Sequence, residues 1–235
     1  MDNIPPYISL VFVATTLATL GFVIYSVDVA LKKQKPIAFY AYTGFLITWL
    51  IATSFLASKE FFLDLDFRPP KLFPFVAFFI LTGLSVFFFR TGREILQKLP
   101  ITSLTYLHII RVPVEIVLWW LFLQGKVDKD MTFEGMNYDI LSGITAPFAA
   151  LFLVGQKTKS RIGAIIWNLL ALGLLVNIVS RAIMATPYFF DPARFDIPNV
   201  AVLYSPYVWL PAFIVPCVFL AHIVSLYQLF REKEE

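Results

Sequence analysis

Charged residues are scarce in this sequence. Aspartate, glutamate, lysine and arginine make up 15% of its 235 residues, whereas 59% are hydrophobic. A soluble domain has about 25% charged residues, which help to cover its surface. The composition therefore excludes an ordinary soluble domain. There is no basic tail either, and so the sequence predicts no nucleic-acid partner.

Cysteine and histidine are nearly absent. The single cysteine, Cys217, rules out an intramolecular disulfide and lies in an apolar segment. The two histidines, His108 and His222, form no short metal-ligand motif, and neither HExxH nor GxSxG occurs. We therefore expect no metal and assign no catalytic residue. A haem or pigment held between His108 and His222 is the one cofactor that we keep as an alternative.

Long apolar runs, by contrast, are abundant, and several exceed the roughly 18 residues that indicate a membrane-spanning helix. We predict an all-α fold in which residues 1–235 form a single integral-membrane domain, a bundle of seven transmembrane helices. The fifth predicted span contains Pro147 and small polar residues, so we expect it in the interior of the bundle. The predicted spans are 7–31, 37–56, 72–97, 101–125, 139–155, 163–185 and 200–230.

Lysine and arginine are divided unevenly between the two sets of connecting loops. The loops after the first, third and fifth spans, together with the C-terminus, carry more of them than the N-terminus and the other loops. Cytoplasmic loops carry such an excess. We therefore expect the N-terminus outside and the C-terminus in the cytoplasm, in the cell (inner) membrane.

The loop after the fourth span has alternating polar residues that are similar to a calcium-binding loop. Phe133 stands where an EF-hand loop counted from Asp128 needs glycine, so that motif fails. We expect the polar side chains of this loop to be solvated. Its apolar residues, among them Met131 and Met136, predict that the loop folds back onto the bundle as a lid. The polar residues are Asp128, Asp130, Thr132, Glu134, Asn137 and Asp139.

The fourth span carries His108, Arg111 and Glu115 near its middle. Such groups cost several kcal/mol in hydrocarbon and are usually functional. Their spacing of three and four residues places them on one face of a helix, where Arg111 and Glu115 can pair. Pro113 lies among them and weakens the local helix. An ion pair that only fixes helix packing is the alternative interpretation.

Polar residues in the sixth and seventh spans lie at matching depths. Counted from the cytoplasmic ends, His222 is level with His108, and Asn177 is level with Glu115. Arg181 lies one turn beyond Asn177 on the same face. Asn168 falls on the opposite face, where we expect a packing role.

If these faces converge, two arginines, two histidines and one glutamate form an interior site. Its positive balance favours an anionic or amphipathic ligand held by Arg111 and Arg181. We therefore predict binding, and possible translocation, of a small solute or protons, with His108 and His222 as a proton relay. An intramembrane enzyme acting on a lipid or isoprenoid, and a non-catalytic structural or sensor protein, are the alternatives. Membrane lipids are the other expected partners, and the oligomeric state is open.

Overall fold

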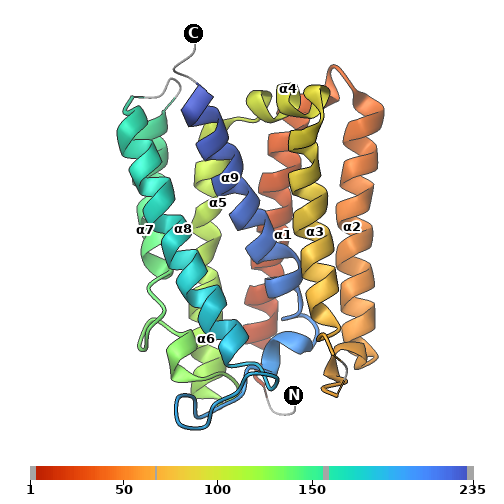
Figure 1. The fold of residues 1–235 in the computed structure, drawn as a ribbon, viewed down its shortest axis with the longest axis vertical. Helices are drawn as coiled ribbons and strands as arrows, with labels where there is room; N and C mark the ends of the chain where they lie inside the picture. Colours follow the sequence, from red (N-terminus) through yellow and green to blue (C-terminus); the bar gives the residue numbers. More distant parts are fainter. Residues whose placement is uncertain (1–3, 67, 156–158, 232–235) are drawn as a thin grey trace.

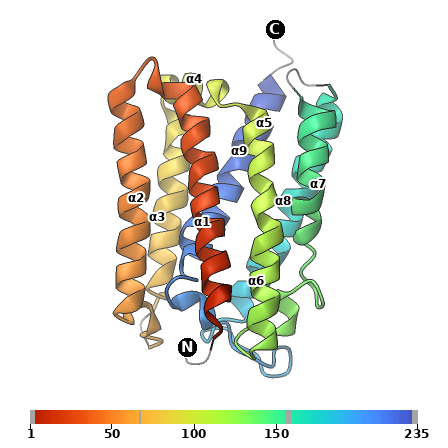
Figure 2. The ribbon, with the colours of Figure 1, turned by 180° about the vertical axis from the view of Figure 1, so that it is seen from behind.

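A computed structural model describes residues 4–66, 68–155 and 159–231. This part of the chain is all-α, with long helices running side by side (Figures 1 and 2). We call the end of the bundle that carries the C-terminus the upper end, and the opposite end, near the N-terminus, the lower end (Figure 1). The helices are α1 (Pro6–Val27), α2 (Pro36–Ser58), α3 (Leu72–Ser85), α4 (Arg90–Lys98), α5 (Ile101–Leu107), α6 (Arg111–Leu123), α7 (Ile140–Phe148), α8 (Arg161–Met184) and α9 (Val215–Arg231).

Short turns of 3-10 or π type extend or join several of these helices. A 3-10 turn, His108–Ile110, joins α5 to α6. The others are Asp28–Lys32 after α1, Val86–Phe88 after α3, Ala149–Val154 after α7 and Leu210–Ile214 before α9, and three isolated 3-10 turns lie at Phe61–Leu63, Lys129–Met131 and Ala201–Leu203.

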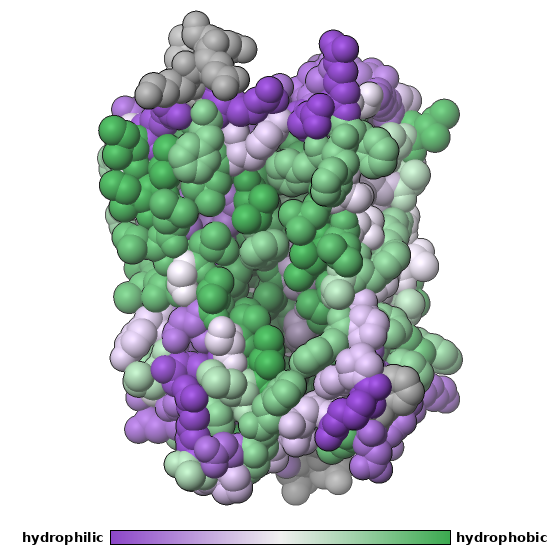
Figure 3. All heavy atoms as spheres, in the orientation of Figure 1, coloured by the Kyte–Doolittle hydropathy of each residue, from purple (hydrophilic) through white to green (hydrophobic). Residues whose placement is uncertain are grey.

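Five of the described helices are long and apolar enough to cross a membrane, which indicates an integral membrane protein. They are Pro6–Lys32, Pro36–Ser58, Ile101–Leu123, Arg161–Met184 and Leu210–Arg231. The pair Leu72–Phe88 and Arg90–Lys98 adds a sixth if it is counted as one span, and the apolar helix Ile140–Val154 is shorter. The predicted count of seven thus stays a prediction. Figure 3 shows the apolar surface that such a protein needs, with hydrophilic residues gathered toward both ends.

The predicted third span, 72–97, is not one continuous helix. The helix breaks at Phe89, whose backbone is extended, and α4 turns away from α3 by 103°. In Figure 1 α4 lies across the upper end of the bundle. Arg90, Arg93 and Lys98 are exposed there, and these charges are far cheaper at the membrane surface than in hydrocarbon.

Prolines reshape the fourth and seventh predicted spans. Pro113 has no N–H to donate to the carbonyl of Ile109, and the chain tightens to a 3-10 turn just before it. The seventh helix begins at Leu210 rather than near residue 200, and it opens with a π turn around Pro211. Pro216 likewise cannot donate to the carbonyl of Ala212, which instead accepts a hydrogen bond of 2.9 Å from the Trp49 indole.

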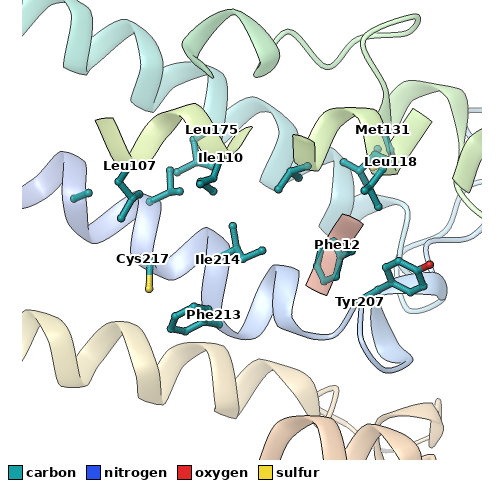
Figure 4. Packing of buried hydrophobic residues seen from close by; sticks show 14 of the residues in the cluster. Phe12, Leu107, Ile110, Leu118, Met131, Leu175, Tyr207, Phe213, Ile214 and Cys217 are labelled. Carbon is teal, nitrogen blue, oxygen red and sulfur yellow. The ribbon is translucent and has the colours of Figure 1, made fainter. Parts of the chain in front are cut away.

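The core of the bundle surrounds α9. This helix packs against α3, α4, α5 and α8, and most of its residues are buried. Figure 4 shows Leu107 and Ile110 on one side of α9, with Phe213 and Cys217 on the side that faces α3. His222, a polar residue of the same helix, is also buried. Its side chain contacts His108, which follows α5, and Arg111 of α6.

Candidate functional site

Arg111 is the centre of a buried polar cluster. Its side chain is 3% exposed, and its guanidinium donates three hydrogen bonds. Nη1 donates to Asp139 Oδ1 and to the carbonyl of Ala171, each at 3.1 Å, and Nη2 donates to His222 Nε2 at 2.9 Å. These partners come from α8, α9 and the start of α7, so Arg111 ties α6 to three other helices. We call Arg111, Asp139, His222, Asn168 and His108 the Arg111 cluster.

The close approach of α7 to α6 brings Asp139 within reach of Arg111. Gly143, one turn into α7, makes this possible. A Cβ at that position would lie 2.9 Å from the backbone nitrogen of Val112 and 2.8 Å from its Cγ2. Only a glycine fits there without a backbone shift.

The contacts of His222 define its tautomer. An arginine side chain can only donate, so Nε2 of His222 accepts from Arg111. The remaining ring nitrogen, Nδ1, then carries the proton and donates to Asn168 Oδ1 at 2.9 Å. Asn168 in turn donates to the carbonyl of Ala164. The neutral ring of His222 is therefore held on both sides.

His108 lies flat against His222. Their ring centroids are 3.9 Å apart, and Trp167 meets the His108 ring at 5.4 Å. The expected match in depth between the two histidines is confirmed. Rings in such contact leave no space for a porphyrin between them in this structure, so the geometry does not support the haem or pigment alternative. Both nitrogens of His108 are buried without a hydrogen-bond partner in the described residues, a costly state in an apolar interior.

Glu115 does not form the predicted ion pair with Arg111. The ion pair of Arg111 is with Asp139, and both carboxylate oxygens of Glu115 accept from Asn137 Nδ2, at 2.6 and 2.7 Å. The same amide also donates to the carbonyl of Met131 at 2.9 Å. Arg111 and Glu115 share a helix face, but a loop and the start of α7 supply their partners.

Asn177 and Arg181 lie outside this cluster. Arg181 pairs with Asp130 of the lower-end loop at 2.9 Å, and Asn177 donates to the carbonyl of Met136 in the same loop. A bond of 3.2 Å from Arg181 Nε to Asn177 joins the two. They hold the loop, and the predicted interior site with two arginines does not form.

The loop between α6 and α7 is not the solvated segment that we expected. Asp128, Thr132, Asn137 and Asp139 are buried. Asp128 Oδ2 accepts from the backbone nitrogens of residues 196 and 197, at 2.7 and 3.2 Å, and so joins this loop to the one after α8. The predicted fold-back holds at Met131, which is 2% exposed, but not at Met136, which is 43% exposed.

A cavity of about 450 Å³ adjoins the cluster, and we call it the Glu115 cavity. It lies between α3, α6, α8 and the start of α9, and most of its lining is aliphatic. Its acidic lining residues are Glu115 and Asp139. The lining therefore combines aliphatic side chains with a few polar groups, as is common in small-molecule sites, and we call the part of the cavity at Glu115 and Asp139 its polar end.

With Glu115 ionised, the charges at this polar end sum to a negative value. Arg111 is matched by Asp139, the His222 ring is neutral, and the partner of Glu115 is a neutral amide. With Arg181 engaged elsewhere, one carboxylate is left without an ion pair. This reverses the positive balance that the sequence predicted.

Three members of the site were missed or misjudged at the sequence level. Asn137 and Asp139 were placed among solvated loop residues, and Asn168 among packing residues. Their signal is weak, because a polar Asn-Tyr-Asp run before an apolar segment is also what an ordinary helix start looks like. Within the described residues no group of three histidine, cysteine, aspartate or glutamate side chains is placed to hold a metal ion.

Comparison with known proteins gives one match. The model of a family described as a domain of unknown function (DUF8737) matches residues 70–230. The matched range runs from α3 through nearly all of α9 and contains every member of the Arg111 cluster. No curated protein and no solved structure matches the chain.

Proposed function

The chain belongs to the DUF8737 family, a domain of unknown function, and from its own geometry we propose that it binds a small amphipathic molecule inside the membrane. The apolar part of this ligand lies in the Glu115 cavity, and its polar end donates a hydrogen bond to Glu115. The observation that carries the proposal is the lining of the cavity, which is mostly aliphatic and includes the carboxylates of Glu115 and Asp139.

The charge balance supports a ligand with a donor group, such as a hydroxyl or an amine. A buried carboxylate without an ion pair is costly, and a donor or a proton reduces that cost. An anionic ligand, which the sequence favoured, is less suited because it would add charge beside Glu115. The Arg111–Asp139 pair keeps the guanidinium from acting as an anion site.

We extend the proposal to translocation of the ligand or of protons. Glu115 takes up a proton when the ligand leaves. The relay that we propose through His222 and the stacked His108 has less support, because Arg111 separates His222 from Glu115 and the His108 nitrogens have no hydrogen-bond partner among the described residues. The enzyme alternative has less support, because neither histidine lines the Glu115 cavity. The structural alternative predicts only a change of stability on substitution.

The experiment compares Glu115→Gln with Glu134→Gln, an exposed acid on the adjoining loop. Native mass spectrometry of the purified protein shows which molecule is retained, and reconstituted liposomes report proton or solute flux. We expect the retained ligand and the flux to be lost in Glu115→Gln and kept in Glu134→Gln. Equal retention by both variants contradicts the proposal.

We also propose that the protein spans the cell (inner) membrane seven times, with the N-terminus outside. The bent pair α3–α4 and the helix Ile140–Val154 then count as the third and fifth spans. The basic residues at the upper end, including Lys33, Lys35 and Arg93, support a cytoplasmic location for that end.

A further inference from the structure

A second cavity, of about 340 Å³, lies at the upper end of the bundle. We call it the α4 cavity, because Ile95 and Leu96 of α4 form its roof. Its walls come from α1, α2, α3, α5 and α9, and it shares no lining residue with the Glu115 cavity. Nearly all of the lining is hydrocarbon. In Figure 4 Cys217, one of its few polar lining residues, points from α9 toward α3.

The helix α4 has the form of a membrane-surface helix. Gly92 and Leu96 are buried toward the bundle, while Arg93 and Lys98 are exposed. Gly92 lets α4 fold down closely, since a Cβ there would lie 2.8 Å from Val86 Cγ1. A short helix with an apolar face inward and a basic face outward lies at the level of lipid headgroups.

Two lining residues of the α4 cavity, Ala38 of α2 and Thr82 of α3, are exposed, and so we place its opening at the seam between these two helices. Lower in this seam the rings of Trp49, Phe75 and Phe78 pack together, with centroids 5.5 to 5.8 Å apart where Trp49 meets the two phenylalanines. At the level of the cavity the seam carries the small residues Ala38 and Thr82, which are exposed although they line the cavity. A chain from the surrounding bilayer can enter there without crossing water.

The segments beside the cavity lining carry four basic residues, which we call the basic rim, and the one acid of α4, Glu94, is paired with Arg90. Lys33 and Lys35 from the α1–α2 connection, with Arg93 and Lys98 of α4, are exposed and have no ion-pair partner among the described residues. Lys98 Nζ donates to Gln34 at 2.6 Å, which joins α4 to that connection. Basic side chains at the membrane surface attract anionic headgroups.

We propose that the α4 cavity binds an acyl chain of an anionic phospholipid, with the headgroup phosphate on Lys33, Lys35, Arg93 and Lys98. The lateral opening selects a molecule that is already in the bilayer, and the charge of the rim selects an anionic one. This site is independent of the Glu115 cavity and of the ligand proposed there.

The test uses the full chain in nanodiscs of phosphatidylglycerol mixed equally with phosphatidylcholine, followed by native mass spectrometry of the released protein. Ala38→Phe narrows the opening, and Ala52→Phe is its control, because Ala52 is exposed on the same helix and lines no cavity described here. Arg93→Gln with Lys98→Gln removes rim charge, and Lys59→Gln with Lys129→Gln removes the same charge at the lower end.

We expect the unaltered protein to retain phosphatidylglycerol in preference to phosphatidylcholine. Ala38→Phe should abolish this preference, and the Arg93 and Lys98 double substitution should weaken it by about tenfold. Both controls should retain it. The proposal is overturned if the two lipids are retained equally by the unaltered protein, if Ala38→Phe retains as much phosphatidylglycerol as Ala52→Phe, or if both charge variants lose it alike.

Discussion

The guanidinium of Arg111 offers only donors, and this determines the roles of the groups around it. His222 must accept at Nε2, Asp139 must supply a negative charge, and Glu115 is left to a neutral amide. The two carboxylates at the polar end of the cavity thus have different roles. Asp139 balances a charge, whereas Glu115 remains available to a ligand or a proton.

The tautomer of His222 is a direct prediction of this arrangement. We expect its neutral ring to carry the proton on Nδ1, because Nε2 accepts from Arg111 and Nδ1 donates to Asn168. Solid-state NMR of protein labelled with ¹⁵N-histidine separates protonated from bare ring nitrogens, and the chain has only two histidines. In Arg111→Gln the glutamine can also accept, so the preference should weaken. A ring protonated on Nε2 in the unaltered protein would be evidence against the network.

The Arg111–Asp139 pair should show strong coupling in stability. Arg111→Gln or Asp139→Asn alone leaves a buried charge without its partner and should destabilise the protein by about 3–5 kcal/mol. The double variant should lose much less than the sum of the two. Thermal unfolding in detergent measures this, with the exposed pair Asp28–Lys32 as the control. Additive losses would contradict a direct interaction.

At the scale of helices, α7 and the loop before it bring acidic and amide groups to α6. The loop supplies Asn137, and the first residue before α7 is Asp139. Arg181 and Asn177 of α8 hold this loop from outside. The polar end of the Glu115 cavity therefore depends on one tight contact between α6 and α7.

Substitution of Gly143 tests that contact. In Gly143→Ala the new Cβ meets the backbone of Val112, so α7 must move outward, and we expect a loss of about 1–3 kcal/mol. The shift should also draw Asp139 away from Arg111. Gly173→Ala in α8 is the control, because nothing lies within 4 Å of its Cβ position. Thermal unfolding of the two variants gives the comparison, and equal behaviour would show that α7 is not tightly packed.

Sequence patterns predicted the helices well and their partners poorly. The apolar runs indicated the helices, and Pro113 indicated a weak point in the fourth span, because hydropathy and missing N–H groups are local properties. The position of α4 was missed, since an apolar run continues smoothly into Arg90. The pairing of Arg111 with Asp139 depends on how α7 packs against α6, and the sequence of one helix does not reveal which other helix it contacts.

At the scale of the whole molecule, the two ends of the bundle differ in charge and in form. The upper end carries the basic rim and the surface helix α4. The lower end carries two loops that Asp128 joins, and one of them leads into Asp139 of the Arg111 cluster. The two proposed sites lie toward opposite ends, so a cytoplasmic upper end would place the anionic-lipid site in the leaflet whose lipids are most negatively charged.

Lysine labelling tests this orientation. A membrane-impermeant amine reagent added to intact cells should modify Lys59 and Lys129 at the lower end and spare Lys33, Lys35 and Lys98 at the upper end; all five are exposed. The same reagent added after lysis should modify both sets, which controls for intrinsic reactivity. Mass spectrometry of the purified protein identifies the modified residues. The opposite labelling pattern would mean that the upper end, with its basic rim, lies outside the cell. The protein would then be an exception to the rule that cytoplasmic loops carry the excess of lysine and arginine.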